Sequence, residues 1–160
     1  MKDVINNLIK LNKTISTMES CTGGFLASSI TNIDDSSKVF KFGAVTYSNE
    51  YKIKMGVDSN IIDKYTVYSM ETANAMSKAI CSFTNSSYGV GITGKLNKQD
   101  DSNPYGSNNI VYVSVYDKEK NHNYTMTIED LIGDRESMKQ QIIDRDQPQG
   151  IQSKDHCGRS

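Results

Sequence analysis

Residues 18–26 read Met18-Glu19-Ser20-Cys21-Thr22-Gly23-Gly24-Phe25-Leu26. A short β-prone run, Thr14 to Met18, stops just before Ser20, and two glycines follow where an apolar helix is expected to begin. This layout predicts a strand-to-helix turn that places a hydroxyl beside backbone N–H groups left unpaired by the helix. Ser20 is therefore a candidate nucleophile. The alternative is an ordinary tight turn with a Ser or Thr cap.

The two glycines of this stretch favour the functional interpretation. In a first helical turn, Gly23 and Gly24 would each cost about 1 kcal/mol relative to alanine. They are easier to understand if another molecule approaches the backbone closely at that point. We therefore expect a ligand beside Thr22, Gly23 and Gly24.

Length and charge limit the class of protein. A chain of 160 residues is long enough for one domain with a proper apolar core. Its net charge of −1 predicts no general attraction to nucleic acid or to an anionic membrane surface. No window approaches the roughly 20 apolar residues of a membrane span, and the N-terminus does not resemble a signal peptide. We expect a cytoplasmic protein that binds neither membranes nor, directly, nucleic acid.

Cysteine and histidine usage argues against a metal site. Cys21, Cys81 and Cys157 are odd in number and show no C-x-x-C spacing, so no disulfide framework or zinc site is indicated. His122 and His156 have no partner at ligand spacing. We expect no bound metal.

Hydrophobic periodicity predicts helices that alternate with strands and then a late hairpin. The expected helices are 4–11, 22–31, 70–83 with Ser69 as N-cap, and one starting near Asp134, and the expected strands are 14–18, 39–47, 88–93, 110–116 and 124–128. This order predicts an α/β fold, a three-layer α/β/α sandwich around a mixed β-sheet. Polar connections are expected at 48–69 and 95–108. We expect one domain over 1–145, with 146–160 a disordered or non-native tail.

Four polar segments then lie at expected strand ends or helix starts, namely 19–24, 47–52, 91–94 and 133–136. Ser-Cys-Thr-Gly-Gly is followed about 27 residues later by Tyr-Ser-Asn-x-x-Lys, and then by Gly-Asp-Arg-Glu. From about residue 3 to 145, this combination resembles the CinA carboxy-terminal domain family. The enzymatic members of that family are nicotinamide mononucleotide amidases with the CinA C-terminal domain-like fold.

The resemblance implies a Ser/Lys hydrolase and assigns roles to matching positions. Ser20 is the implied nucleophile and Lys52 its general base, with Tyr47 beside them in the polar network. Thr93 and Arg135 are implied to hold the substrate, a small pyridine nucleotide. The same segments place the following residues around that substrate: Glu19, Thr22, Gly23, Gly24, Ser48 and Asn49. The implied assembly is compatible with a homodimer.

These residue types suit amide hydrolysis. A lysine serves as base only if its pKa falls from about 10.4 toward neutrality, through burial or a nearby positive charge. The pyridinium nitrogen of the substrate supplies such a charge and draws electrons from the amide. Backbone amides near Thr22–Gly24 are candidate oxyanion donors, each worth roughly 3–4 kcal/mol in hydrolases. No metal or redox cofactor is needed.

Each assignment has a plainer alternative. The alternative for Lys52 is a solvated lysine, which is by far the commonest kind, and Tyr47 could simply close a strand. Arg135 lies unfavourably in the first turn of a helix, which suits contact with an anion such as phosphate; its alternative is a surface pair with Asp134 or Glu136. Glu19 could be a helix-start acid, or could orient Lys52 or the ribose.

Cys21 is a rival nucleophile, since a thiol near a helix N-terminus is acidified. It ranks second because no histidine is placed to serve it.

The chain also departs from the family. After Thr93-Gly94, the usual glycine-rich loop is replaced by Lys95-Leu96-Asn97-Lys98-Gln99-Asp100-Asp101, and the last helix ends early. Lys95 or Lys98 could contact phosphate there, although a solvated loop is the simpler interpretation. Two further hypotheses remain: a family member that binds a nucleotide or pyridine ligand without turnover, and an interaction module associated with competence.

Overall fold

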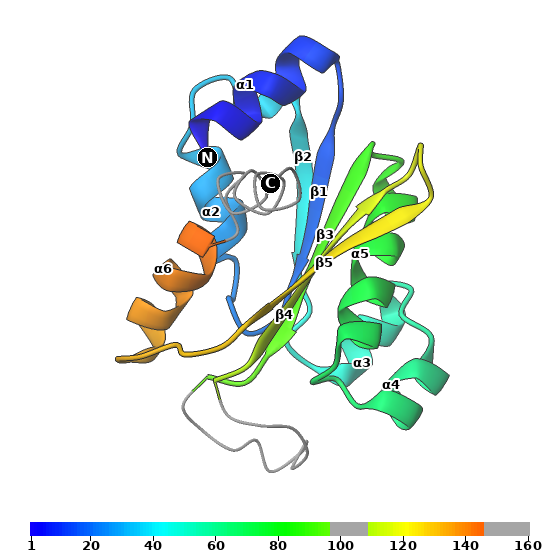
Figure 1. Ribbon diagram of the computed structural model, residues 1–160. Coiled ribbons are helices and arrows are strands. Elements are labelled where there is room, and N and C mark those ends of the chain that lie inside the picture. The colour runs from blue at the N-terminus through cyan, green and yellow to red at the C-terminus, as the bar shows by residue number, and fades with distance from the viewer. Residues whose placement is uncertain (97–108, 146–160) are drawn as a thin grey trace, which may run out of the picture.

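The computed structural model describes residues 1–96 and 109–145 (Figure 1). Its strands are β1 (Ile15–Glu19), β2 (Phe40–Val45), β3 (Tyr88–Gly94), β4 (Val111–Asp117) and β5 (His122–Ile128). Its helices are α1 (Lys2–Leu11), α2 (Phe25–Thr31), the short 3₁₀ helix η1 (Ser36–Lys38), α3 (Asn49–Lys54), α4 (Ser59–Tyr65), α5 (Met70–Thr84) and α6 (Arg135–Arg145).

The five strands form one mixed sheet in the order β2-β1-β3-β4-β5. β1 lies between β2 and β3 and runs parallel to both, while β4 and β5 form an antiparallel hairpin. Glu19 at the end of β1 pairs with Val45 of β2 and with Ile92 of β3. The carboxyl ends of the three parallel strands therefore meet at one edge of the sheet, where ligands commonly bind in α/β folds.

Helices cover both faces of the sheet, so the predicted three-layer α/β/α sandwich is confirmed. α1, α2 and α6 lie on one side, and α3, α4 and α5 lie on the other (Figure 1). A larger apolar cluster joins the first layer to the sheet, through residues such as Ile5, Ile30 and Ile142. A smaller cluster on the opposite face includes Met18, Met76 and Ile80.

Gly91 of β3 lets the longest helix lie close against the sheet. A Cβ built on Gly91 would stand 2.4 Å from the carbonyl oxygen of Ala73 in α5, which is closer than any real contact. The glycine therefore fixes the spacing between β3 and α5, and with it the position of the strand that ends beside Ser20.

The structure corrects two of the expected elements. α2 begins at Phe25 rather than at Thr22, and Gly23 and Gly24 form the preceding turn with φ of +60° and +99°. A left-handed backbone is cheap only for glycine, so the glycines are explained by the turn as well as by any ligand. The expected polar connection at 48–69 contains two helices, α3 and α4, whose shortness hides their periodicity.

Some predictions fall wholly or mainly outside the described residues. The tail at 146–160 and most of the expected loop, 97–108, are among them. Lys95 and Leu96 are described, and both are buried, so the solvated interpretation is wrong for Lys95. Among the helices of the described part, none combines the length and apolar character needed to cross a membrane.

Candidate active site

Ser20 and Lys52 meet at the carboxyl edge of the parallel strands. Lys52 Nζ donates a hydrogen bond to Ser20 Oγ at 3.0 Å, although the two residues are 32 positions apart. The same amine donates to the carbonyl oxygen of Thr46 at 2.7 Å. Only 1% of Lys52 is exposed, so the alternative of a solvated lysine is wrong. The predicted Ser/Lys pair therefore exists as a contact within hydrogen-bond reach.

The strand ends hold Ser20 in place. The Ser20 amide donates to the carbonyl of Ile92 in β3 at 3.0 Å, and the Thr46 amide donates to the carbonyl of Glu19 at 2.8 Å. Both sides of β1 thus stay paired up to Ser20. The Ser20 hydroxyl is fixed by sheet geometry rather than by a free loop.

α3 carries Lys52 to the site. Ser48 caps this helix, because its side chain accepts a hydrogen bond from the Tyr51 amide at 3.2 Å. Asn49 is the first residue of the helix. The roles predicted for Ser48 and Asn49 in substrate binding stay predictions, while the structure shows that Ser48 caps the helix that bears Lys52.

Glu19 is the residue that organises the turn after Ser20. Its buried carboxylate accepts hydrogen bonds from Thr22 Oγ1 at 2.7 Å and from the amides of Leu26 and Ala27 at 2.8 and 3.0 Å. Of the alternatives for Glu19, these contacts support the helix-start acid, and the carboxylate is used by α2 rather than directed at a ligand. The Thr22 hydroxyl is likewise used inside the protein.

At least one backbone amide in the turn after Ser20 is already hydrogen-bonded within the protein, while others remain candidates for binding an oxyanion. The Gly23 amide donates to the carbonyl of Ser20 at 3.0 Å. This bond closes the turn and removes the Gly23 amide from the candidate oxyanion donors. The amides of Thr22 and Gly24 remain as candidates for that role.

Arg135 and Tyr47 form a second polar contact, at the rim of the same edge. The Arg135 guanidinium donates to the carbonyl of Leu96 at 2.7 Å and to the Tyr47 hydroxyl at 3.1 Å. Tyr47 is 64% exposed, and the hydrogen bond shown for its hydroxyl is to Arg135 rather than to the Ser20–Lys52 pair. The alternative for Arg135, a surface pair with Asp134 or Glu136, is not among the ion pairs of the described residues.

Thr93, at the end of β3, and Lys95, just after it, contact the segment between α4 and α5. The Thr93 hydroxyl is buried and donates to the carbonyl of Val67 at 2.7 Å. Lys95 is also buried, with its Nζ 4.7 Å from the centre of the Tyr68 ring. Thr93 therefore braces the segment between α4 and α5, and its predicted contact with substrate stays a prediction.

Cys21 does not have the properties of a nucleophile. Burial raises the pKa of its thiol from the ordinary 9.0 to about 12, and the positive charge of Lys52 offsets only part of this effect. The expectation that the helix N-terminus acidifies this thiol is wrong, because Cys21 belongs to the apolar core. At neutral pH it stays protonated.

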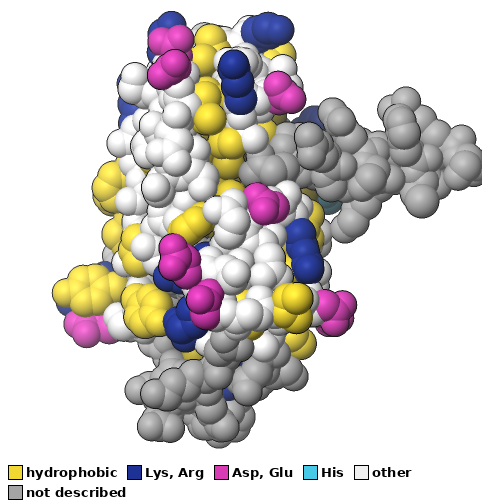
Figure 2. Space-filling model, turned by 90° about the vertical axis from the view of Figure 1, so that its left-hand side faces the viewer, with side chains coloured by type: hydrophobic (Ala, Val, Ile, Leu, Met, Phe, Trp, Pro, Cys, Tyr) yellow, Lys and Arg dark blue, Asp and Glu magenta, His cyan; other side chains and the backbone are white. Residues whose placement is uncertain are grey.

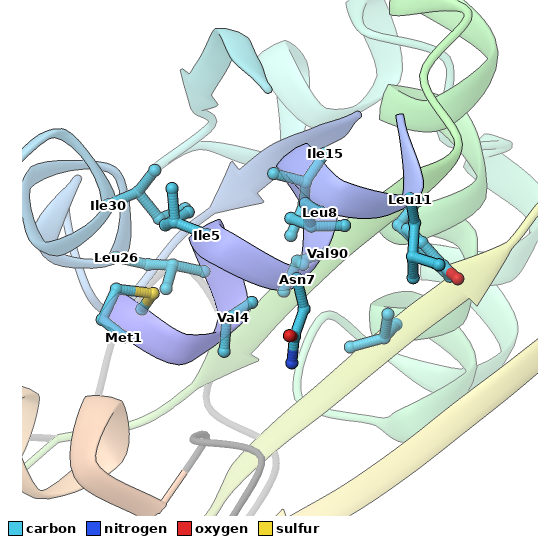
Figure 3. Close-up of a pocket in the computed structure, with 12 residues that line it drawn as sticks. Met1, Val4, Ile5, Asn7, Leu8, Leu11, Ile15, Leu26, Ile30 and Val90 are labelled. Carbon is cyan, nitrogen blue, oxygen red and sulfur yellow. The ribbon is translucent and has the colours of Figure 1, made fainter. Parts of the chain in front are cut away.

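A separate apolar pocket lies under α1, away from these groups. Its volume is about 260 Å³, and its lining includes Val4, Leu8 and Leu11 of α1, Ile30 of α2 and Val90 of β3 (Figure 3). The lining contains neither Ser20 nor Lys52, and its polar members are Asn7 and Tyr88. The pocket carries none of the proposed chemistry.

Sequence reasoning missed three contributors to the site. The carbonyls of Thr46 and Leu96 are backbone groups, whose use no side-chain pattern reveals. Lys139 of α6 places its Nζ 3.4 Å from a Cβ built on Gly23. Its spacing of four residues from Arg135 was the available signal, because i and i+4 share one face of a helix.

Together, the sheet order and the Ser20–Lys52 contact define an α/β protein with a serine–lysine pair at the carboxyl edge of its parallel strands. The CinA C-terminal domain family matches residues 1–146. The chain belongs to this family, in agreement with the resemblance seen in its motifs.

Relatives and solved structures agree with this membership. A Clostridium kluyveri relative, provisionally named competence-damage inducible protein, is 39% identical over 120 residues, which is 74% of this chain and 29% of the relative. A CinA-like protein of Kosmotoga olearia is 40% identical over 114 residues, covering 71% of this chain and 27% of the relative. The chain thus spans under a third of the length of these relatives.

The fold recurs in crystal structures. A competence or damage-inducible protein from Enterobacter asburiae superposes with a TM-score of 0.79 over 89% of this chain and 87% of its own, at 20% identity. A CinA superfamily protein from Escherichia coli gives a TM-score of 0.76 at 26% identity, over 86% and 78% of the two chains.

Proposed function

We propose that this chain hydrolyses the carboxamide of nicotinamide mononucleotide, giving nicotinate mononucleotide and ammonia. The observation that carries the proposal is the 3.0 Å contact between buried Lys52 Nζ and Ser20 Oγ. A serine hydroxyl attacks an amide only when a base takes its proton, and this contact supplies a base at the required distance.

Both contacts of the buried Lys52 amine are compatible with its proposed role as a base. Burial disfavours the charged form of an amine in general. In the neutral form, an N–H still donates to the carbonyl of Thr46, and the lone pair accepts the proton of the Ser20 hydroxyl. The same two contacts thus hold the base in both protonation states.

The reaction then follows in two halves. Ser20 Oγ forms a bond to the carboxamide carbon while Lys52 takes its proton, and the carbonyl oxygen becomes an oxyanion facing the amides of Thr22 and Gly24. Lys52 returns the proton to the nitrogen as the C–N bond breaks and ammonia leaves. Water next attacks the acyl-Ser20 ester with Lys52 as base, which releases the carboxylate and restores the hydroxyl.

The position of Arg135 favours a nucleotide over a free pyridine as the substrate. Its guanidinium is positioned by the Leu96 carbonyl and the Tyr47 hydroxyl, and it has no carboxylate partner among the described residues. Guanidinium groups bind phosphate oxygens with favourable geometry. In the proposal, Arg135 contacts the phosphate of the substrate, at the rim of the site.

Product analysis tests the proposal. The protein is incubated with nicotinamide mononucleotide, and in parallel with free nicotinamide, while ammonia is measured and the pyridine product is identified by mass. We expect ammonia and nicotinate mononucleotide in equal amounts from the nucleotide and far slower release from nicotinamide. Saturable binding of the nucleotide without ammonia release would instead favour the ligand-binding hypothesis.

A further inference from the structure

A second cation, Lys139, stands over the turn that follows the candidate nucleophile. α6 packs beside α2 (Figure 1). Its Lys139 Nζ lies 3.4 Å from the position that a Cβ on Gly23 would occupy. A side chain at residue 23 would therefore meet the amine directly. The Lys139 amine thus lies within van der Waals distance of the turn that follows Ser20.

Lys139 and Arg135 share one side of α6. They are four residues apart, which places them one above the other on a helix. Each extends to a different part of the strand-end edge: Arg135 to Leu96 and Tyr47, and Lys139 to Gly23.

Neither cation forms an ion pair with a carboxylate of the described residues. The ion pairs found within residues 1–96 and 109–145 involve other lysines, namely Lys13, Lys38 and Lys54. Like charges four residues apart destabilise a helix, and an anion bound between them would remove that repulsion. Two cations on one side of α6 can therefore share a single anion.

We propose that Lys139 is a specificity-determining residue that binds the phosphate monoester of the substrate together with Arg135. This inference rests on the proposed function and goes beyond it by naming a second phosphate ligand. A phosphate dianion suits the pair, because Arg135 offers a planar fork of donors and Lys139 a compact point charge. Lys139 thus selects nucleotides over nucleosides and leaves the acyl transfer to Ser20 and Lys52.

The test compares two substrates that differ only in the phosphate. Binding of nicotinamide mononucleotide and of nicotinamide riboside is measured by titration calorimetry, alongside ammonia release, for the wild type and the Lys139→Met variant. We expect Lys139→Met to raise Kd and KM for the nucleotide by about tenfold, with kcat within about twofold and the riboside values unchanged. Lys139→Arg should restore most of the affinity.

Lys120→Met is the matched control, since this exposed lysine lies in the β4–β5 connection at the other end of the sheet. Equal losses for nucleotide and riboside in Lys139→Met, or no loss for either, would overturn the inference. A wild type that does not prefer the nucleotide in binding would overturn it too. If the wild type binds the nucleotide tightly but releases no ammonia, the proposed function fails, and the binding comparison still decides the role of Lys139.

Discussion

At the residue scale, Ser20 and Cys21 are neighbours in the chain, but their side chains lie in different chemical environments. Ser20 contacts the Lys52 amine, whereas Cys21 is packed into the apolar core and keeps its proton. The higher intrinsic reactivity of a thiolate is irrelevant here, because burial holds the pKa of the thiol at about 12. In the proposed mechanism, the surroundings of each side chain, rather than the intrinsic reactivity of oxygen or sulfur, determine which residue acts as the nucleophile.

The raised pKa of Cys21 predicts a pH dependence of stability. In the unfolded chain the thiol ionises near pH 9.0, while in the folded protein it keeps its proton up to about pH 12. The folded state therefore binds more protons between these values, so this contribution is complete below pH 9 and is lost as pH rises toward 12. We expect the difference in unfolding free energy between wild type and Cys21→Ala to shrink over this range, as measured by urea denaturation at pH 8 to 11. A constant difference across that range would contradict the assignment.

Tyr47 gives a second prediction at this scale. Its hydroxyl accepts a hydrogen bond from Arg135 at an exposed position, so we expect Tyr47→Phe to change the unfolding free energy by less than about 0.5 kcal/mol. Because Arg135 would lose one of its two positioning contacts, KM for nicotinamide mononucleotide should rise severalfold while kcat stays near the wild-type value. Steady-state kinetics decide the matter: a large fall in kcat would make Tyr47 part of the acyl-transfer machinery instead.

At the scale of elements, the turn between β1 and α2 depends on one carboxylate. Glu19 binds the Thr22 hydroxyl and two amides of the first turn of α2. Glu19→Gln keeps the size but replaces one acceptor oxygen by a donor, which would face a buried N–H. We expect a loss of about 1–3 kcal/mol in unfolding free energy, together with a lower kcat because the candidate oxyanion amides shift. Chemical denaturation of Glu19→Gln beside the exposed control Glu129→Gln tests this, and equal stability of the two variants would refute it.

How well the sequence predicts the structure also differs from one helix or strand to the next. The long amphipathic helix α5, its Ser69 cap and the β4–β5 hairpin were predictable because each has a full periodic pattern and a clear end. α3 and α4, of six and seven residues, were not predicted, since two turns contain too few apolar positions to show a period. Lys52 was nevertheless identified, from the family motif rather than from its helix.

From the sequence, the candidate site could be predicted only as a set of residues in separate segments, without the contacts between them. The sequence placed Ser20 and Lys52 near strand ends, but their contact depends on how α3 packs against the sheet, which is a tertiary property. The inward orientation of Glu19, the burial of Lys95 and the placement of Lys139 over Gly23 depend on tertiary packing in the same way. Backbone acceptors such as the Thr46 carbonyl leave no mark in a sequence at all.

At the scale of the whole molecule, the sheet brings three parallel strand ends together and the helices supply the polar groups around them. α3 provides Lys52 from one layer, and α6 provides Arg135 from the other. The candidate site therefore lies between the two helical layers, at one edge of the sheet. The predicted homodimer stays a prediction at this scale.

Charge at this scale predicts no direct binding to DNA, although the relatives' names refer to competence. The net charge is −1, and on the face shown in Figure 2 the lysines and arginines are interspersed with acidic side chains. Since DNA affinity depends mainly on neutralising phosphates, we expect no shift of duplex DNA in a gel assay at low salt. Salt-sensitive binding in the micromolar range would instead support the interaction-module hypothesis.

The measurement that tests the central claim most directly is the rate of ammonia release from nicotinamide mononucleotide by four proteins: wild type, Ser20→Ala, Lys52→Met and Cys21→Ala. A serine nucleophile with a lysine base predicts that Ser20→Ala and Lys52→Met each lower kcat by about 10⁴-fold or more, although each retains the fold by circular dichroism. Cys21→Ala should keep activity within a fewfold of wild type. A folded Ser20→Ala or Lys52→Met protein that still turns over at the wild-type rate, or loss of activity in Cys21→Ala alone, would contradict the account.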